Sequence, residues 1–210
     1  FMNRAIMDEN TGKPAQGMTL PNMPDMGNFN PVKMPGMPQA GPGLENRENF
    51  FFGGKGASDV KLQYVDDNAD SYLNIWNSAK TDITSADKER LIESLKNLSN
   101  NEHIESVVDI DQVIRFFVVH NYVCNGDSYT GSMIHNYYLY EEDGRMAMIP
   151  WDYNLAFGTF QGGNAQSTIN TPIDSPISGG SSDDRPMWNW IVANKEYTEL
   201  YHQYFVELLN

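Results

Sequence analysis

The sequence contains a single cysteine, Cys124, and no long run of apolar residues. One cysteine cannot form an intrachain disulfide, which excludes the small secreted scaffolds that disulfides hold together. The absence of any run of about 18 or more apolar residues predicts that the chain has no membrane span. Because the sequence begins with Phe1 and not with an initiator methionine, we expect a soluble fragment of a longer protein.

Basic residues are scarce as well, with 14 Lys and Arg against 28 Asp and Glu and a formal net charge of −14. This balance excludes nucleic acid as a main partner, because the phosphate backbone would repel the protein. A basic protein, or an anion bound through a metal ion, fits the charge better. The 40% hydrophobic content suffices for one compact domain with a core.

Regular periodicity is missing from the first part of the chain. Pro, Gly, Met and Asn recur there in MTLPNMPDMGNFNPVKMPGMPQAGPG, a composition typical of flexible or extended segments. We therefore predict that residues 1–56 form an insert or extended segment with little regular structure. Residues 57–210 have the composition of an ordinary globular domain.

Two helices are predicted in the first half of this domain. TSADKERLIESLKNLS begins with Thr84 as N-cap and Asp87 as its capping-box partner, and its Leu and Ile residues share one face. DIDQVIRFFVVHNYVC has the helical spacing of a buried segment, with Asp109 or Asp111 as its cap.

The period then changes to two. HNYYLYEEDGRMAMIPWD predicts a β-hairpin that turns at Asp143 and Gly144. A long loop follows, and two helices close the chain, one around MWNWIVAN and one from Glu196 onward.

Two acidic residues stand at the ends of these predicted elements. Asp127 follows the second helix in NGD, and Asp152 follows the second strand of the hairpin. Both would be held by packed elements and can share one site. Two carboxylates placed together repel each other unless a divalent cation joins them. Oxygen ligands without a Cys or His pair at zinc spacing favour Mg²⁺ or Mn²⁺ over Zn²⁺.

The same order occurs in the catalytic half of protein kinases: a helix, a loop with the catalytic Asp, a short hairpin, and a metal-binding Asp followed by a glycine. NGDSYTGSMIHNYYLYEEDGRMAMIPWDYNLAFG carries that order. With DIDQVIRFFVVHNYV before it and RPMWNWI and EYTELYHQYF after it, the chain resembles the CotH family of spore-coat kinases over roughly residues 57–210.

The resemblance implies an α+β, atypical protein-kinase-like fold, mainly the helical C-lobe with a hairpin that carries the metal-binding Asp, plus part of an N-lobe. It implies transfer of the γ-phosphoryl group of ATP to Ser or Thr of basic, Ser-rich coat or surface proteins. Asp127 corresponds to the catalytic Asp, which would act as the base that accepts the hydroxyl proton or would orient the hydroxyl, and Asp152 corresponds to the Asp that binds Mg²⁺ or Mn²⁺. Asn136 is a further candidate for contact with metal or nucleotide phosphate. The family places such a protein in the spore coat or the cell envelope.

Several kinase features are absent from the sequence. No His-Arg pair precedes Asp127, Gly158 lies six residues after Asp152, and neither a G-x-G-x-x-G loop nor a V-A-I-K lysine is found. Lys55 and Lys61 are the nearest lysines. Either the small lobe lies upstream, or the chain is a catalytically incomplete scaffold or binding module for spore-coat or cell-surface assembly. A third hypothesis, a secreted carbohydrate-associated domain, is supported by the aromatic content alone and ranks last.

Other notable residues have simpler interpretations. His120 and His135 are expected to be hydrogen-bonded core histidines without a catalytic role. VDDNADS resembles the start of a calcium loop but has no glycine at the sixth position, so we expect a solvated turn. Trp188 and Trp190 are expected to be core or interface residues and not a sugar-binding platform.

Overall fold

The computed structural model describes residues 57–210, and the prediction for residues 1–56 lies outside this range. The described part combines α-helices with one two-stranded antiparallel sheet, which agrees with the predicted α+β class. The elements are α2 (Leu73–Ser78), α3 (Ser85–Asn100), α4 (Ile104–Val107), α5 (Ile110–Tyr122), β1 (Tyr137–Glu142), β2 (Arg145–Pro150), α6 (Ala165–Thr168), α7 (Pro186–Ala193) and α8 (Lys195–Leu209). Short 3-10 turns lie at Ala69–Tyr72, Tyr153–Leu155, Phe160–Gly162 and Ser182–Asp184.

The helix starts follow from local hydrogen bonds. At α3, the side chain of Thr84 accepts from the main-chain N–H of Asp87, and the Asp87 carboxylate accepts from the main-chain N–H of Thr84, which confirms the predicted capping box. At α5, the structure decides between the two candidate caps, because Asp109 accepts from the main-chain N–H of Gln112 at 3.1 Å.

The hairpin also forms as predicted. Its strands pair from Tyr137 opposite Pro150 to Glu142 opposite Arg145. The two residues between the strands, Asp143 and Gly144, both have positive φ, at 52° and 81°. Two-residue loops of this kind match the twist of the strands they join. The register fixes the end of β2, and therefore the place of Asp152, relative to the start of β1.

The other edge of β2 is paired by a side chain. The amide of Gln112, on the first turn of α5, donates to the main-chain oxygen of Met148 and accepts from its N–H at 2.9 Å. Next to this pair, the main-chain N–H of Asp109 donates to the main-chain oxygen of Met146 at 2.9 Å. The start of α5 thus takes the place of a third strand and fixes the hairpin to the helix.

We expect Gln112→Leu to lower the free energy of unfolding by about 1–3 kcal/mol, because it leaves both main-chain polar groups of buried Met148 without a partner. Urea denaturation measures the change. Gln203→Leu is the matched control: Gln203 is exposed on α8 and bonds only to the side chain of Glu207, so a change within about 0.5 kcal/mol is expected. Equal effects of the two substitutions would contradict the role of Gln112.

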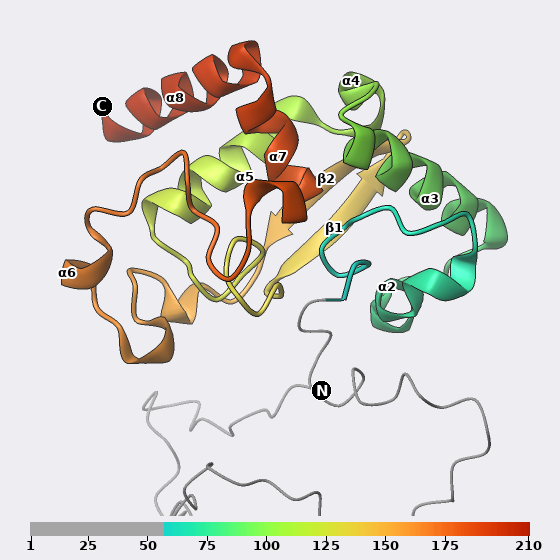
Figure 1. The fold of residues 1–210 in the computed structure, drawn as a ribbon, viewed down its shortest axis with the longest axis horizontal. Coiled ribbons are helices and arrows are strands. Elements are labelled where there is room, and N and C mark those ends of the chain that lie inside the picture. The colour runs from blue at the N-terminus through green and yellow to red at the C-terminus, as the bar shows by residue number, and fades with distance from the viewer. Residues whose placement is uncertain (1–56) are drawn as a thin grey trace, which may run out of the picture. The chain divides into compact units, whose positions relative to one another are not determined.

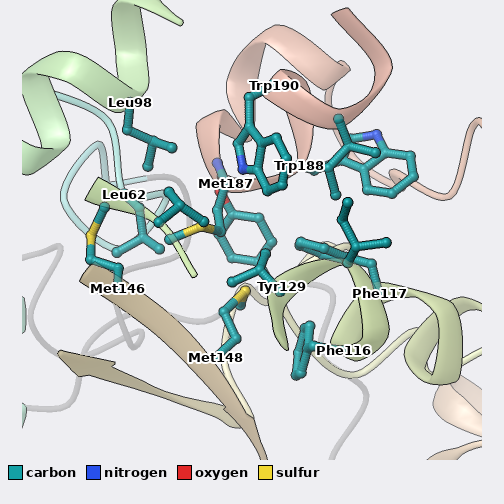
Figure 2. Close-up of a cluster of buried hydrophobic side chains, with 14 of the residues drawn as sticks. Leu62, Leu98, Phe116, Phe117, Tyr129, Met146, Met148, Met187, Trp188 and Trp190 are labelled. Atoms are coloured by element: carbon teal, nitrogen blue, oxygen red, sulfur yellow. Dashed lines mark hydrogen bonds between the residues drawn. The ribbon is translucent and has the colours of Figure 1, made fainter. Parts of the chain in front are cut away.

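One hydrophobic core joins the hairpin to the helices. In Figure 1 the hairpin crosses the middle of the domain, and α5 contacts both β2 and α8, while α7 contacts α3 and α8. Trp188 and Trp190 are buried in this core, as predicted, so they form no exposed sugar platform. Figure 2 shows central side chains converging from α3, α5, α7, β2 and two connecting segments: Leu62, Leu98, Phe117, Tyr129, Met146, Met148, Met187, Trp188 and Trp190.

Candidate functional site

The loop that carries Asp127 begins where α5 ends, and it closes tightly on itself. Gly131 lies so near Gly126 that a Cβ on Gly131 would be 1.9 Å from the main-chain oxygen of Gly126. The N–H of Gly131 donates to the main-chain oxygen of Ser128 at 3.0 Å. Only glycine fits at position 131, and this close approach sets the backbone on both sides of Asp127.

Buried side chains attach the Asp127 loop to the rest of the domain. The guanidinium of Arg185, which is 1% exposed, donates to the main-chain oxygens of Tyr129 at 3.1 Å and Gly131 at 3.4 Å. The hydroxyl of Tyr129 donates to the main-chain oxygen of Lys61 at 2.8 Å and accepts from the N–H of Met187 at 3.2 Å. The loop is therefore attached both to the start of the described domain and to the start of α7.

Asp127 itself is held at both carboxylate oxygens. Oδ1 lies 2.8 Å from Nε2 of His135, and Oδ2 accepts from the side-chain amide of Asn136 at 3.1 Å. The same amide also donates to the main-chain oxygen of Asp127 at 2.8 Å. Burial raises the pKa of Asp127, and the negative charge of Asp152 raises it further, whereas His135 and Asn136 act in the opposite direction.

Asp152 is exposed directly after β2, and its backbone is in the left-handed region with φ at 54°. The chain beyond it returns to the Asp127 loop, where the N–H groups of Phe157 and Gly158 donate to the main-chain oxygens of Val123 and Cys124. Asp152 is close enough for its charge to raise the pKa of Asp127. The structure joins Asp127 and Asn136 by hydrogen bonds, whereas Asp152 acts on Asp127 through its charge and makes no hydrogen bond to either of them.

Several residues at this site have a strained backbone. Besides Asp152, positive φ values occur at Cys124 (48°), Ile134 (54°) and Asn136 (57°). Asn and Asp tolerate this region, but a β-branched residue such as Ile134 is an outlier there. Each strained residue costs on the order of 1 kcal/mol or more and persists only when its surroundings force it, which happens most often at functional sites.

His135 differs from the sequence expectation, whereas His120 follows it. His120 is 1% exposed in α5, but the side chain of His135 is 42% exposed and lies against Asp127. The signal that was missed is its position next to Asn136, because a segment that brings Asn136 to Asp127 also brings its neighbour.

The described residues contain no group of three or more His, Cys, Asp or Glu side chains that could hold a metal ion. Mg²⁺ does not require such a group, because it is commonly bound through one or two carboxylates together with substrate phosphates and water. Asp152, which is exposed, fits this mode: burial raises the pKa of Asp127 and the charge of Asp152 adds to that shift, and a divalent cation would relieve the part that comes from repulsion between the two carboxylates.

Among residues 57–210, Lys61 does not have the setting of the strand lysine that contacts the nucleotide phosphates in ordinary kinases. Lys61 lies in a turn and not in a strand, and its Nζ is 3.7 Å from a carboxylate oxygen of Asp184. Lys55 lies outside the described residues. VDDNADS leads into the 3-10 turn Ala69–Tyr72 and supplies its first three residues, and the side chain of Asn68 caps this turn by accepting from the N–H of Asp70.

The net negative charge of the chain comes from residues 57–210, which carry the site. Residues 1–56 contain five acidic and five basic side chains, so the formal net charge of −14 falls on residues 57–210. The potential around the site therefore favours cations and basic segments.

Comparison with known proteins gives one match. The family model described as CotH kinase protein matches residues 40–210, which is more than half of the chain. Neither the curated proteins nor the solved structures contain a significant match. Within the described range, no helix is both long and apolar enough to cross a membrane.

Proposed function

Because the chain belongs to the CotH kinase family, we propose that it transfers the γ-phosphoryl group of ATP to Ser or Thr hydroxyl groups of proteins. The observation that supports the proposal is that the chain following Asp152 is hydrogen-bonded to the segment that leads into the Asp127 loop. Each of these two aspartates follows a rigid element, and the charge of Asp152 contributes to the raised pKa of Asp127. Such a pair serves phosphoryl transfer, where catalysis consists mainly of positioning and charge stabilisation.

The residues divide the work as follows. Asp152, exposed and without a hydrogen-bond partner among the described side chains, would hold Mg²⁺ or Mn²⁺ with the nucleotide phosphates, and Asn136 would make a second contact. The bound cation supplies neutralisation of the phosphate charge. Asp127 organises the acceptor side of the site. The acceptor oxygen forms a bond to the γ-phosphorus, and the bond from that phosphorus to the bridging oxygen of ADP breaks.

The charge of the domain suggests the substrate class. A net charge of −14 on residues 57–210 attracts Lys- and Arg-rich segments, so basic, Ser-rich coat or surface proteins are the proposed acceptors. The family resemblance places such proteins in the spore coat or the cell envelope.

The experiment combines the protein, Mg²⁺, γ-labelled ATP and a peptide rich in Lys and Ser. We expect label transfer by the wild type and a loss of about 100-fold or more in Asp152→Asn. Asparagine preserves the shape of Asp152 and tolerates its positive φ. Asp82→Asn, in the exposed segment before α3, is the control and should transfer normally. The proposal fails if the wild type transfers no label, or if Asp152→Asn transfers as much as the wild type.

A second candidate function is a binding module without catalysis, for coat or surface assembly. It is favoured by the position of Lys61, which lies in a turn and forms an ion pair with Asp184, and so does not resemble the nucleotide-binding lysine of an active kinase. Thermal denaturation with Mg-ATP separates the two functions, because a ligand at about a hundredfold its dissociation constant stabilises the folded state by about 2.7 kcal/mol. A folded protein without any shift would favour the binding module.

A further inference from the structure

We propose that Trp151 is the residue on which the adenine base of ATP stacks, and that Tyr138 supports its indole from the neighbouring strand. The proposal rests on the proposed phosphotransfer function and deepens it, because it assigns the nucleobase to two residues outside the predicted set.

The outward face of the hairpin carries an aromatic pair. Tyr138 on β1 lies opposite Ile149 on β2, so the two share one face, whereas the adjacent pair, Leu139 and Met148, packs on the core side. Trp151 lies against Tyr138, with the ring centroids 5.5 Å apart and the ring planes at 63°. The pair therefore lies on the outward face, at the end of the hairpin where β1 begins and β2 ends.

The indole of Trp151 is open to solvent. All four tryptophans belong to the described part of the chain, and among them Trp151 alone is exposed, at 43%. In an edge-to-face pair, the edge of one ring meets the face of the other. Whichever ring supplies the edge, at least one face of the indole is not covered by Tyr138. This face is available to a planar aromatic ligand, and stacking on such a face accepts any nucleobase.

The aromatic pair adjoins the residues proposed for the metal and the phosphates. Trp151 directly precedes Asp152, so their Cα atoms are about 3.8 Å apart. Tyr138 is two residues after Asn136. Because a nucleotide carries its base at the opposite end from its γ-phosphate, a ring beside the metal residue is where the base comes to lie when the phosphates are held at Asp152.

A positive charge beside the pair favours a nucleotide over the basic acceptor segment. Nζ of Lys80 lies 5.8 Å from the ring centre of Tyr138, and Lys80 forms no ion pair with a carboxylate of residues 57–210. In a chain with a net charge of −14, this exposed ammonium group attracts phosphate and repels a Lys-rich peptide. A nucleotide combines a π-face with phosphate groups, so it matches both the indole and the lysine.

The test compares Mg-ATP with Mg-tripolyphosphate, which has the phosphate groups but no base. In calorimetric titrations, the wild type should bind ATP about tenfold or more tightly than tripolyphosphate. Trp151→Ala should lose this preference, because its Kd for ATP rises about tenfold while its Kd for tripolyphosphate stays within about twofold. The unchanged Kd for tripolyphosphate shows that the adjacent metal site is intact. Trp151→Phe keeps a π-face and should retain part of the preference.

Tyr140→Ala is the matched control. Tyr140 is 45% exposed on the same strand and the same face, where it lies opposite Ala147. It is two residues, or about 7 Å along the strand, farther from Asn136 than Tyr138 is. We expect Tyr140→Ala to bind ATP and tripolyphosphate as the wild type does.

A second measurement is independent of activity. Since Trp151 is the exposed tryptophan, stacking of the base should quench the indole fluorescence of the wild type with a saturable dependence on Mg-ATP. Trp151→Phe should show no such quenching, and Mg-tripolyphosphate should quench neither protein.

The outcomes are distinct. Peptide phosphorylation together with an unchanged Kd for ATP in Trp151→Ala, or equal affinities of the wild type for ATP and tripolyphosphate, overturns the role of Trp151 but leaves the kinase function intact. Quenching by the Lys- and Ser-rich peptide in place of Mg-ATP assigns this face to the acceptor and also overturns the proposal. Absence of both ATP binding and label transfer in the wild type overturns the kinase function and the nucleobase site with it.

Discussion

Replacing Gly131 by alanine is expected to lower the free energy of unfolding by about 3 kcal/mol or more and to remove phosphotransfer. The new Cβ would lie 1.9 Å from the main-chain oxygen of Gly126 and 2.8 Å from its carbonyl carbon. Neither atom belongs to a side chain that can rotate away, so the backbone must move. Overpacking of this kind costs several kcal/mol when no rearrangement relieves it.

The displaced backbone is the part that positions Asp127. Gly131 also accepts a hydrogen bond from Arg185, so a shift at Gly131 weakens the attachment of the loop to the buried guanidinium. Activity should therefore fall even at temperatures where the variant remains folded.

Gly126→Ala is the matched control, in the same loop and of the same chemistry. Its Cβ would lie 3.6 Å from the ring of Phe160, an ordinary van der Waals contact, and its φ is not positive. We expect a change within about 1 kcal/mol and retained activity. Chemical denaturation and peptide phosphorylation measure both variants, and equal destabilisation would show that the contact between Gly131 and Gly126 is not decisive.

A second large effect on the free energy of unfolding is expected when the pH is lowered. His120 is buried in α5 beside Phe116, with Nε2 at 2.8 Å from the hydroxyl of Thr130, and burial lowers its pKa from 6.5 to about 4. Below pH 6.5, His120 becomes protonated in the unfolded chain, but in the folded protein it becomes protonated only near pH 4. The free energy of unfolding should therefore fall as pH drops through this window, by about 3 kcal/mol in total.

Other groups titrate differently. Asp127 acts in the opposite direction, because its raised pKa favours the folded state as pH falls. Asp87 has its pKa lowered to about 2 by hydrogen bonds from Thr84 and Arg90, so its contribution is lost only below pH 4.

The contribution of His120 is isolated by comparing the wild type with His120→Gln, in which an amide nitrogen replaces Nε2. Urea denaturation between pH 4 and pH 7 should show a slope in the wild type that is smaller in the variant. His103→Asn, at an exposed position whose φ of 51° suits Asn, should keep the wild-type slope. If His120→Gln leaves the slope unchanged, buried His120 is not its source.

Local chemistry explains what the sequence predicts well. The capping box of Thr84 and Asp87, and the turn at Asp143 and Gly144, depend on residues within three positions of each other, and both form. The choice between Asp109 and Asp111 as the cap of α5 depended on where β2 lies, since the N–H of Asp109 also pairs with Met146.

Contacts between distant segments account for what the sequence could not predict. Arg185 bonds to Tyr129, which lies 56 residues earlier in the chain, and Gln112 bonds to Met148, 36 residues later. Helical and strand periodicity in the sequence does not indicate such long-range pairs. His135 was missed for another reason: aromatic neighbours in the sequence predict a buried ring, but the positive φ at Ile134 and Asn136 turns the segment so that the ring faces Asp127.

The edge of β2 that faces α5 has a consequence for solubility. Exposed strand edges are templates on which other chains add strands and aggregate. Here the polar groups of Met148 are engaged by Gln112, the oxygen of Met146 by Asp109, and Pro150 has no N–H to offer. This edge can accept no further strand, so a two-stranded sheet is protected against intermolecular pairing along β2 without the cost of a third strand.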